Sequence, residues 1–136
     1  MEVVYQDEFI ELRKSDIDHC IEYIRNKLSP DADTDKEILN KLAFQIQGNF
    51  FYKVICDVSK LDFVHDATRE YLKNFCVPFL ASIGARVFAV VTGENEEKRK
   101  YYQDLATEMS EITNEWKIQP GFFDEMDEAR EWIRDK

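Results

Sequence analysis

The sequence contains few of the residues that form disulfide frameworks and flexible linkers, and it contains no repeat. Its three cysteines, Cys20, Cys56 and Cys76, are odd in number, lie in apolar contexts and show no Cys-x-x-Cys spacing, so we expect reduced thiols in a core. Only four glycines and three prolines are present, and no low-complexity stretch interrupts the chain. The 136 residues are therefore predicted to form one domain, residues 1–136.

Basic residues and long apolar runs are also scarce. With 18 basic and 28 acidic residues, the formal net charge of −10 repels nucleic-acid phosphates and anionic lipid headgroups. The longest apolar tract, residues 76–91, is interrupted by Pro78, Gly84 and Arg86 and is shorter than the roughly 20 apolar residues of a membrane-spanning helix. The N-terminus has no basic segment followed by an apolar run. We expect a cytoplasmic protein without nucleic-acid partners or membrane insertion.

Short apolar runs open the chain. Residues 3–5 and 9–12 predict two initial strands or one long bulged strand. Residues 16–28 are ambiguous, because their isoleucines and Leu28 follow helical spacing, whereas residues 20–24 could equally form a strand. The spacing by itself favours a helix.

Helices then alternate with apolar strands. Thr34 and Glu37 form a capping box that predicts a helix start, and Gly48 predicts the end of that helix. Residues 50–58 are nearly continuous in apolar and β-prone residues, as expected of a strand buried on both faces, and residues 86–92 predict a second such strand.

The connection between those two strands predicts a helix that begins near Asp66. It presents an apolar face that includes Phe75, and Pro78 predicts a kink or a restart. After the second strand, Asn95 is a candidate helix cap.

The C-terminal part predicts a short strand at 116–118, a turn at 119–121 and a final helix capped by Asp124. The fold class is therefore α/β, a single layered domain in which helices pack on a mixed sheet of about four to five strands. Most strands should be parallel with right-handed crossovers, and the pattern also allows antiparallel pairing of the first strands. Residues 51–57 and 87–91 should be adjacent buried strands.

Four segments carry a resemblance to a known family: residues 55–61, 71–84 with Pro78, 87–91, and 122–133 with their Phe-Asp-x-x-x-x-Ala-x-x-Trp pattern. They resemble the STAS domains, in the SpoIIAA-like (anti-anti-sigma-factor-like, STAS/SEC14-related) branch. The resemblance implies a SpoIIAA/STAS-like fold, and it favours a strand over residues 20–25.

In regulatory members of that family, a serine of an Asp-Ser-Ser-Gly motif is phosphorylated at the start of the helix after the central strand. The matching residues here are His65-Asp-Ala-Thr68, with Ala67 at the acceptor position, and alanine cannot be phosphorylated. Thr68 lies one position later, where helix amides would favour a phosphate. A threonine in a first helical turn is more often an ordinary helix-start residue.

Candidate chemistry is sparse. The two histidines, His19 and His65, are not spaced with cysteine or carboxylate as metal ligands are, so we expect no metal site. Cys56 beside Asp57 could form a thiol nucleophile with His65 as base, but an apolar strand would raise the thiol pKa. We expect no enzyme activity and no cofactor.

Two functions of different classes remain. The first is a non-enzymatic STAS-like module for protein interaction or regulation, with an unknown protein partner. Its candidate partner-binding residues are Ser59, His65, Asp66, Thr68 and Arg69. The alternative is a carrier of a small apolar or anionic ligand, by analogy with SEC14, bound beyond the C-terminal ends of the sheet strands. Its candidate ligand-binding residues are Asp57, Ser59, Lys60, Thr92, Gly93 and Asn95.

Overall fold

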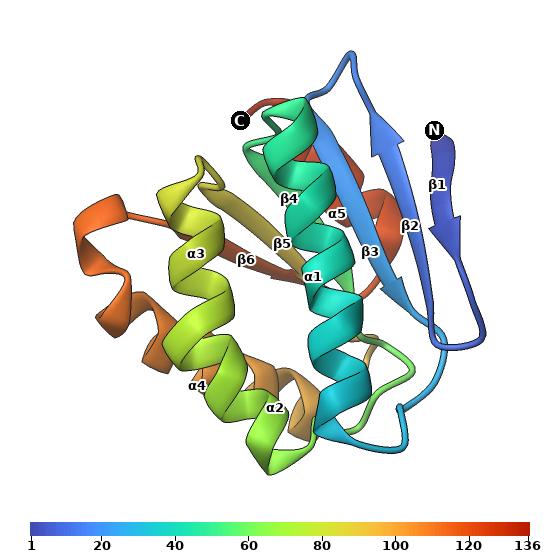
Figure 1. The fold of residues 1–136 in the computed structure, drawn as a ribbon, viewed down its shortest axis with the longest axis vertical. Coiled ribbons are helices and arrows are strands. Elements are labelled where there is room, and N and C mark those ends of the chain that lie inside the picture. Colours follow the sequence, from blue (N-terminus) through green and yellow to red (C-terminus); the bar gives the residue numbers. More distant parts are fainter.

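A computed structural model describes residues 1–136, which are arranged around one six-stranded sheet (Figure 1). The strands lie in chain order across the sheet, antiparallel from β1 to β3 and parallel from β3 to β6. They are β1 (Glu2–Gln6), β2 (Ile10–Ser15), β3 (Cys20–Arg25), β4 (Lys53–Asp57), β5 (Val87–Val91) and β6 (Gln119–Phe123). The predicted fold class is confirmed, with more strands than expected, and β4 and β5 are adjacent inside the sheet.

The parallel strands are joined by helical crossovers. The helical elements are α1 (Ala32–Asn49), α2 (Asp66–Tyr71), the π-helical segment η1 (Leu72–Cys76), α3 (Val77–Ser82), α4 (Glu96–Ile112), the 3₁₀ turn η2 (Asn114–Trp116) and α5 (Met126–Arg134). None of them combines the length and the hydropathy that crossing a bilayer requires. Crossovers of one hand between strands in chain order place α1, α2–α3 and α4 on one face of the sheet, and α5 covers the other.

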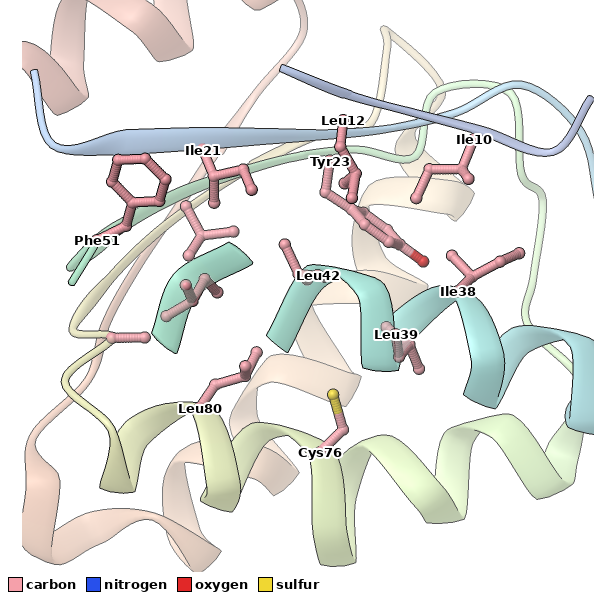
Figure 2. Packing of buried hydrophobic residues seen from close by; sticks show 13 residues of the cluster. Ile10, Leu12, Ile21, Tyr23, Ile38, Leu39, Leu42, Phe51, Cys76 and Leu80 are labelled. Carbon is pink, nitrogen blue, oxygen red and sulfur yellow. The ribbon is translucent and has the colours of Figure 1, made fainter. Parts of the chain in front are cut away.

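The core therefore has two sides. Neighbouring residues of a strand point to opposite faces, so Val54 packs under α1 while Ile55 packs under α5. On the first side, α1 and the α2–α3 segment lie next to each other over the sheet, and Leu42, Cys76 and Leu80 meet between them (Figure 2). This layering positions the start of α2 against the start of α1.

Pro78 interrupts the long helical segment between β4 and β5. Leu72–Cys76 forms a π turn, in which the Val77 N–H donates to the Leu72 carbonyl, and Pro78 lies in the first turn of α3. Proline has no N–H and clashes with the preceding turn, so the widened turn accommodates it. The predicted interruption is confirmed.

Residues 20–25 form strand β3, as the family resemblance favoured, and the helix indicated by spacing is wrong. β3 lies between β2 and β4, and almost every residue in it is buried. A strand buried on both faces loses the polar alternation that identifies strands, so its isoleucines can mimic a helical repeat. Ile17, which that helix would have buried, is 91% exposed in the β2–β3 turn.

The ends of α1 differ from their prediction. Asp31 is the N-cap, because its side chain accepts from the Thr34 N–H, so Thr34 lies within the first turn and does not cap it. At the other end α1 passes through Gly48, and Phe50 takes the left-handed conformation with φ 57°. The expected roles of Thr34 and Gly48 are therefore wrong.

The cap of α4 is confirmed and that of α5 is not. Asn95 accepts from the Lys98 N–H, which satisfies one free amide of the first turn of α4. Asp124 instead pairs with Arg99, and Glu125 at the N-cap of α5 makes no side-chain cap bond.

The strand before α5 lies later in the sequence than predicted. Residues 116–118 do not form a strand: Asn114–Trp116 is a 3₁₀ turn and Lys117 is left-handed with φ 53°. The predicted turn at 119–121 belongs to β6, where Pro120 is tolerated because β6 is an edge strand with a free hydrogen-bonding side.

Replacing Ile55 by alanine should test the position of β4. Ile55 is 1% exposed in the middle of the sheet, so Ile55→Ala should lower the free energy of unfolding by about 2–5 kcal/mol. Urea denaturation gives the value, and Ile17→Ala in the exposed turn should change it by less than about 0.5 kcal/mol. An unchanged midpoint for Ile55→Ala would contradict the assignment.

Candidate functional site

The loops that follow β4 and β5 lie against each other. A Cβ atom at Gly93 would lie 3.8 Å from that of Ser59, and Gly93 has the left-handed φ of 79°. Asp57 Oδ1 accepts from the Ser59 N–H at 3.0 Å and from its hydroxyl at 2.7 Å, and Lys98 Nζ donates to the Ser59 carbonyl. These polar groups hold the two loops together.

The other candidate ligand-binding residues either hydrogen-bond within the protein or do not converge on one site. Thr92 is fully buried and its hydroxyl donates to the Gly93 carbonyl, while the Asn95 side chain caps α4. Lys60 is exposed. Because β3 to β6 follow chain order without a reversal, the sheet has no switch point between parallel strands at which a ligand crevice would open. The ends of the strands therefore do not form an evident ligand site.

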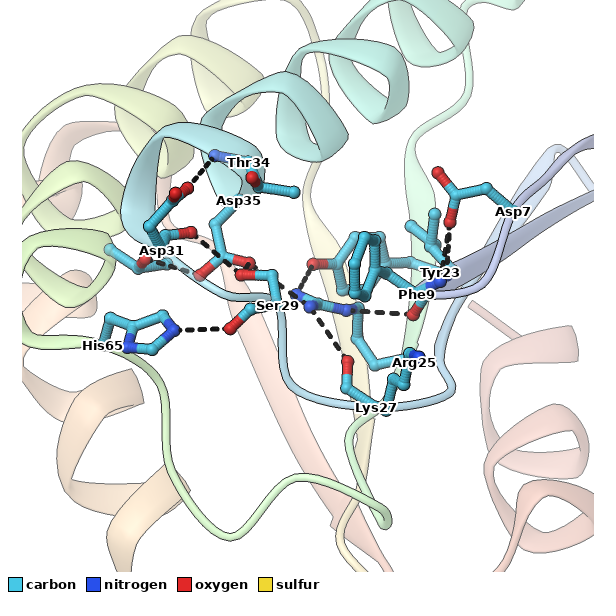
Figure 3. A network of polar contacts seen from close by, with 12 residues as sticks. Asp7, Phe9, Tyr23, Arg25, Lys27, Ser29, Asp31, Thr34, Asp35 and His65 are labelled. Carbon is cyan, nitrogen blue, oxygen red and sulfur yellow. Dashed lines mark hydrogen bonds and ion pairs between the residues drawn. The ribbon is translucent and has the colours of Figure 1, made fainter.

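A buried network of polar side chains holds the start of α1 against β3 (Figure 3). The Arg25 guanidinium lies 3.2 Å from Asp35 Oδ1, and both side chains are almost fully buried. Ser29 also donates to Asp35 Oδ1, at 2.6 Å, and Arg25 Nη1 donates to the Tyr23 hydroxyl at 3.1 Å. Burial raises the pKa of Tyr23 to about 12, so the hydroxyl stays neutral beside the guanidinium.

The start of α2 joins this network. The Thr68 hydroxyl donates to Asp35 Oδ2 at 2.6 Å, and His65 Nε2 lies 2.7 Å from the Ser29 carbonyl oxygen (Figure 3). Thr68 is only 2% exposed, so the expectation that it faces a partner at the surface is wrong. Its position in the first turn points it inward, onto the carboxylate of α1. Asp66 is exposed, as expected.

Arg69 is not a free surface residue either. Its Nη2 donates to Glu108 Oε1 at 3.1 Å, and its guanidinium lies 5.2 Å from the centre of the Tyr101 ring. Both partners belong to α4, so Arg69 connects α2 to α4. Reversing its charge would place a carboxylate against Glu108, and it would disturb packing as well as any interface.

One feature of the sequence predicts this network, although the sequence analysis did not identify it. Asp35 lies on the same helical face as Ile38, Leu39 and Leu42, which predicts a buried carboxylate in need of a partner. Nothing in the spacing identifies Arg25 as that partner, because the turn between β3 and α1 brings them together.

Exposed phenylalanines on the helical layer were also missed. Phe75 is 66% exposed and Phe79 is 45% exposed, both on the α2–α3 segment, and Phe63 precedes α2. Phe75 was expected on the apolar face, but it lies within the π turn, whose extra residue changes the helical register. These side chains are the largest apolar groups that this segment presents to solvent.

The cysteines are free and are poorly suited to nucleophilic chemistry. Cys20 and Cys76 are buried, and Cys56 lines an internal cavity. Burial raises the pKa of each thiol to about 12, so the thiolate is disfavoured at neutral pH. His65 hydrogen-bonds Ser29 and makes no hydrogen bond to Cys56. No group of three histidine, cysteine or acidic side chains is arranged to hold a metal ion.

Comparison with known proteins identifies the fold and no more. No family model matches the chain, and no curated protein matches it. Among solved structures, the NMR structure of the protein TM1081 matches with a TM-score of 0.63 at 14% sequence identity. The match covers 97% of this chain and 94% of that chain. At this identity the likeness shows a shared α/β architecture.

Removing the buried carboxylate should be costly. Asp35→Ala leaves the Arg25 guanidinium buried without its charge partner, so the free energy of unfolding should fall by about 3–5 kcal/mol. Asp33→Ala, an exposed aspartate in the same first turn, should cost only about 0.3–1 kcal/mol. Urea melts of both variants make the comparison. Equal losses would show that the pair does not hold this turn.

The thiols should be inert in the folded protein. With pKa values of about 12, Cys20, Cys56 and Cys76 should not react with a water-soluble disulfide reagent near neutral pH, and all three should react in urea. The absorbance of the thiolate released from the reagent, measured before and after denaturation, gives the number of reactive cysteines. A cysteine that reacts rapidly in the native protein would reopen the nucleophile hypothesis.

Proposed function

We propose that this chain is a non-enzymatic module that binds a protein partner through the outer face of α2–α3. We define this face by its exposed residues, which are Asp66, Ala67, Glu70, Asn74, Phe75, Phe79 and Ser82. The exposure of Phe75 and Phe79 on one helical segment carries the proposal. Aromatic side chains are enriched at protein interfaces, since each offers a large apolar area with few rotatable bonds.

The way this segment is held supports a binding role. Thr68 anchors the start of α2 to Asp35, and Arg69 connects it to Glu108 of α4. Contacts on both sides of the segment reduce the conformational entropy that a partner would have to remove on binding. The outer face is then a preorganised surface.

The STAS resemblance agrees in position with this surface and differs in regulation. In that family the start of the helix after the central strand is where regulatory phosphorylation occurs, and the outer face of α2–α3 begins at the matching place. Here Ala67 cannot accept a phosphate, and Thr68 is buried against a carboxylate that would repel one. The proposed binding is therefore independent of phosphorylation at this turn.

Charge indicates the chemistry of the partner. Asp66 and Glu70 are exposed on the same segment as the phenylalanines, Glu70 pairs with Lys73, and the chain carries a net charge of −10. A complementary protein surface would offer an apolar pocket for Phe75 and basic side chains around it. The same charge disfavours nucleic acid, anionic lipid surfaces and a second copy of this chain.

We also propose that the chain is not an enzyme. The thiols are held protonated by burial, the polar groups at the strand ends bond to one another, and His65 is engaged with Ser29. These observations leave no assembled nucleophile and base.

The test is partner capture from the source organism, followed by affinity measurement with the purified partner. Phe75→Ala combined with Phe79→Ala should weaken binding by about tenfold or more, since buried aromatic anchors commonly contribute above 1 kcal/mol. Phe75 stacks on Tyr71 and Phe79 is 45% exposed, so the double variant should remain folded with a modestly lowered melting temperature.

Ile17→Ala is the matched control, because Ile17 is exposed in the β2–β3 turn, away from α2–α3. It should leave the affinity unchanged. If the double variant and the control bind the same partner equally well, the outer face of α2–α3 is not the interface.

A further inference from the structure

An internal cavity of about 120 Å³ lies between the sheet and the helices α1, α2–α3 and α4. Of its 23 lining residues, 19 are hydrophobic, including Leu39, Cys56, Leu80, Phe88 and Leu105. Protein interiors are packed to the density of organic crystals, with few voids larger than a water molecule. This space is several times larger than one water occupies, about 30 Å³ in the liquid.

Three of the four hydroxyl groups along the lining, all except that of Ser110, are already hydrogen-bonded. The Tyr23 hydroxyl accepts from Arg25, that of Thr68 donates to Asp35, and that of Tyr102 donates to the Leu61 carbonyl at 3.1 Å. Water inside the cavity would find few free partners, because an ordered buried water needs two to four hydrogen bonds, roughly three on average. The cavity therefore favours an apolar occupant over water.

The cavity lies close to the surface beside α4. Ala106 and Ser110 of α4 and Pro120 of β6 line both the cavity and an open groove beside α4. Pro120 is exposed, and the other two are half-buried. A small movement of the second half of α4 relative to β6 would let a compact molecule pass between groove and cavity. The Ser110 hydroxyl lies at this boundary, where it could meet one polar atom of an occupant.

We infer that this cavity is a binding site for one compact, uncharged, apolar molecule of about the size of benzene. An apolar cavity of about 150 Å³ stays dry and binds benzene, and the volume here is similar. The lining places no unpaired charge in the cavity, so a carboxylate or ammonium group would be desolvated without compensation. An aromatic ring or a short branched chain with at most one hydroxyl fits this chemistry. The site is separate from the outer face of α2–α3 and does not depend on it.

Benzene is the probe, and the side-chain methyl groups of the intact protein are the reporters. Titration should produce saturable NMR shifts at Leu80, Met109 and Ile118, which line the cavity. Ile55 and Ile133, on the α5 side of the sheet, should not shift. An absence of saturable shifts, or equal shifts on both sides of the sheet, would overturn the inference.

A cavity-filling variant makes the test specific. Ala106→Leu extends a side chain into the cavity from α4 and should raise the dissociation constant for benzene about tenfold or more. Lys100→Leu, an exposed site on the same helix outside the cavity lining, should leave it within about twofold. Should Ala106→Leu fail to fold, Cys56→Leu fills the cavity from β4 in its place. Wild-type affinity in a folded filling variant would contradict the proposed site.

Discussion

The arrangement of the helical layer depends on one buried charge pair. Arg25 ends β3 and Asp35 lies in the first turn of α1, and the turn between them folds so that the two charges meet away from water. Neither charge could remain buried alone, because its desolvation would be uncompensated. Arg25 also donates to the carbonyls of Phe9 and Lys27, so one guanidinium fixes the β1–β2 connection and the turn before α1. Removing either partner would leave the other charge buried and unpaired.

The contacts that position α2 and α4 continue from this charge pair. Asp35 receives the Thr68 hydroxyl, which places the start of α2, and Arg69 then reaches Glu108 on α4. All three crossovers lie on one face of the sheet, so this layer has an outer surface and an inner surface of different character. Outside, Phe75 and Phe79 meet solvent, and inside, the helices do not completely fill the space above the sheet. The two proposed sites follow from these two surfaces.

Sequence patterns identified β4 and β5 and missed features that tertiary contacts decide. β3 is equally buried, but its isoleucines fall at helical spacing, so the pattern indicated a helix there. β4 and β5 were evident because both faces are covered. β6 was missed because an edge strand tolerates Pro120, a residue that indicates a turn elsewhere. Thr68 and Phe75 were placed on the wrong sides, since neither the carboxylate across the layer nor the π turn is visible in local spacing. Candidate partner-binding and ligand-binding residues are more difficult to predict from sequence, because the packed structure determines which side chains are exposed and where cavities remain.

Amide hydrogen exchange in wild type and Thr68→Val tests most directly whether the network positions α2. A hydrogen bond to a buried carboxylate contributes about 1.5–3 kcal/mol. We therefore expect the hydrogen-bonded amides of α2, those of residues 69–71, to exchange about tenfold faster or more in the variant. The amides of Lys53–Asp57 in β4 should keep their protection. Unchanged protection in α2, or an equal loss in β4, would contradict the claim that this contact holds the outer face of α2–α3 in place.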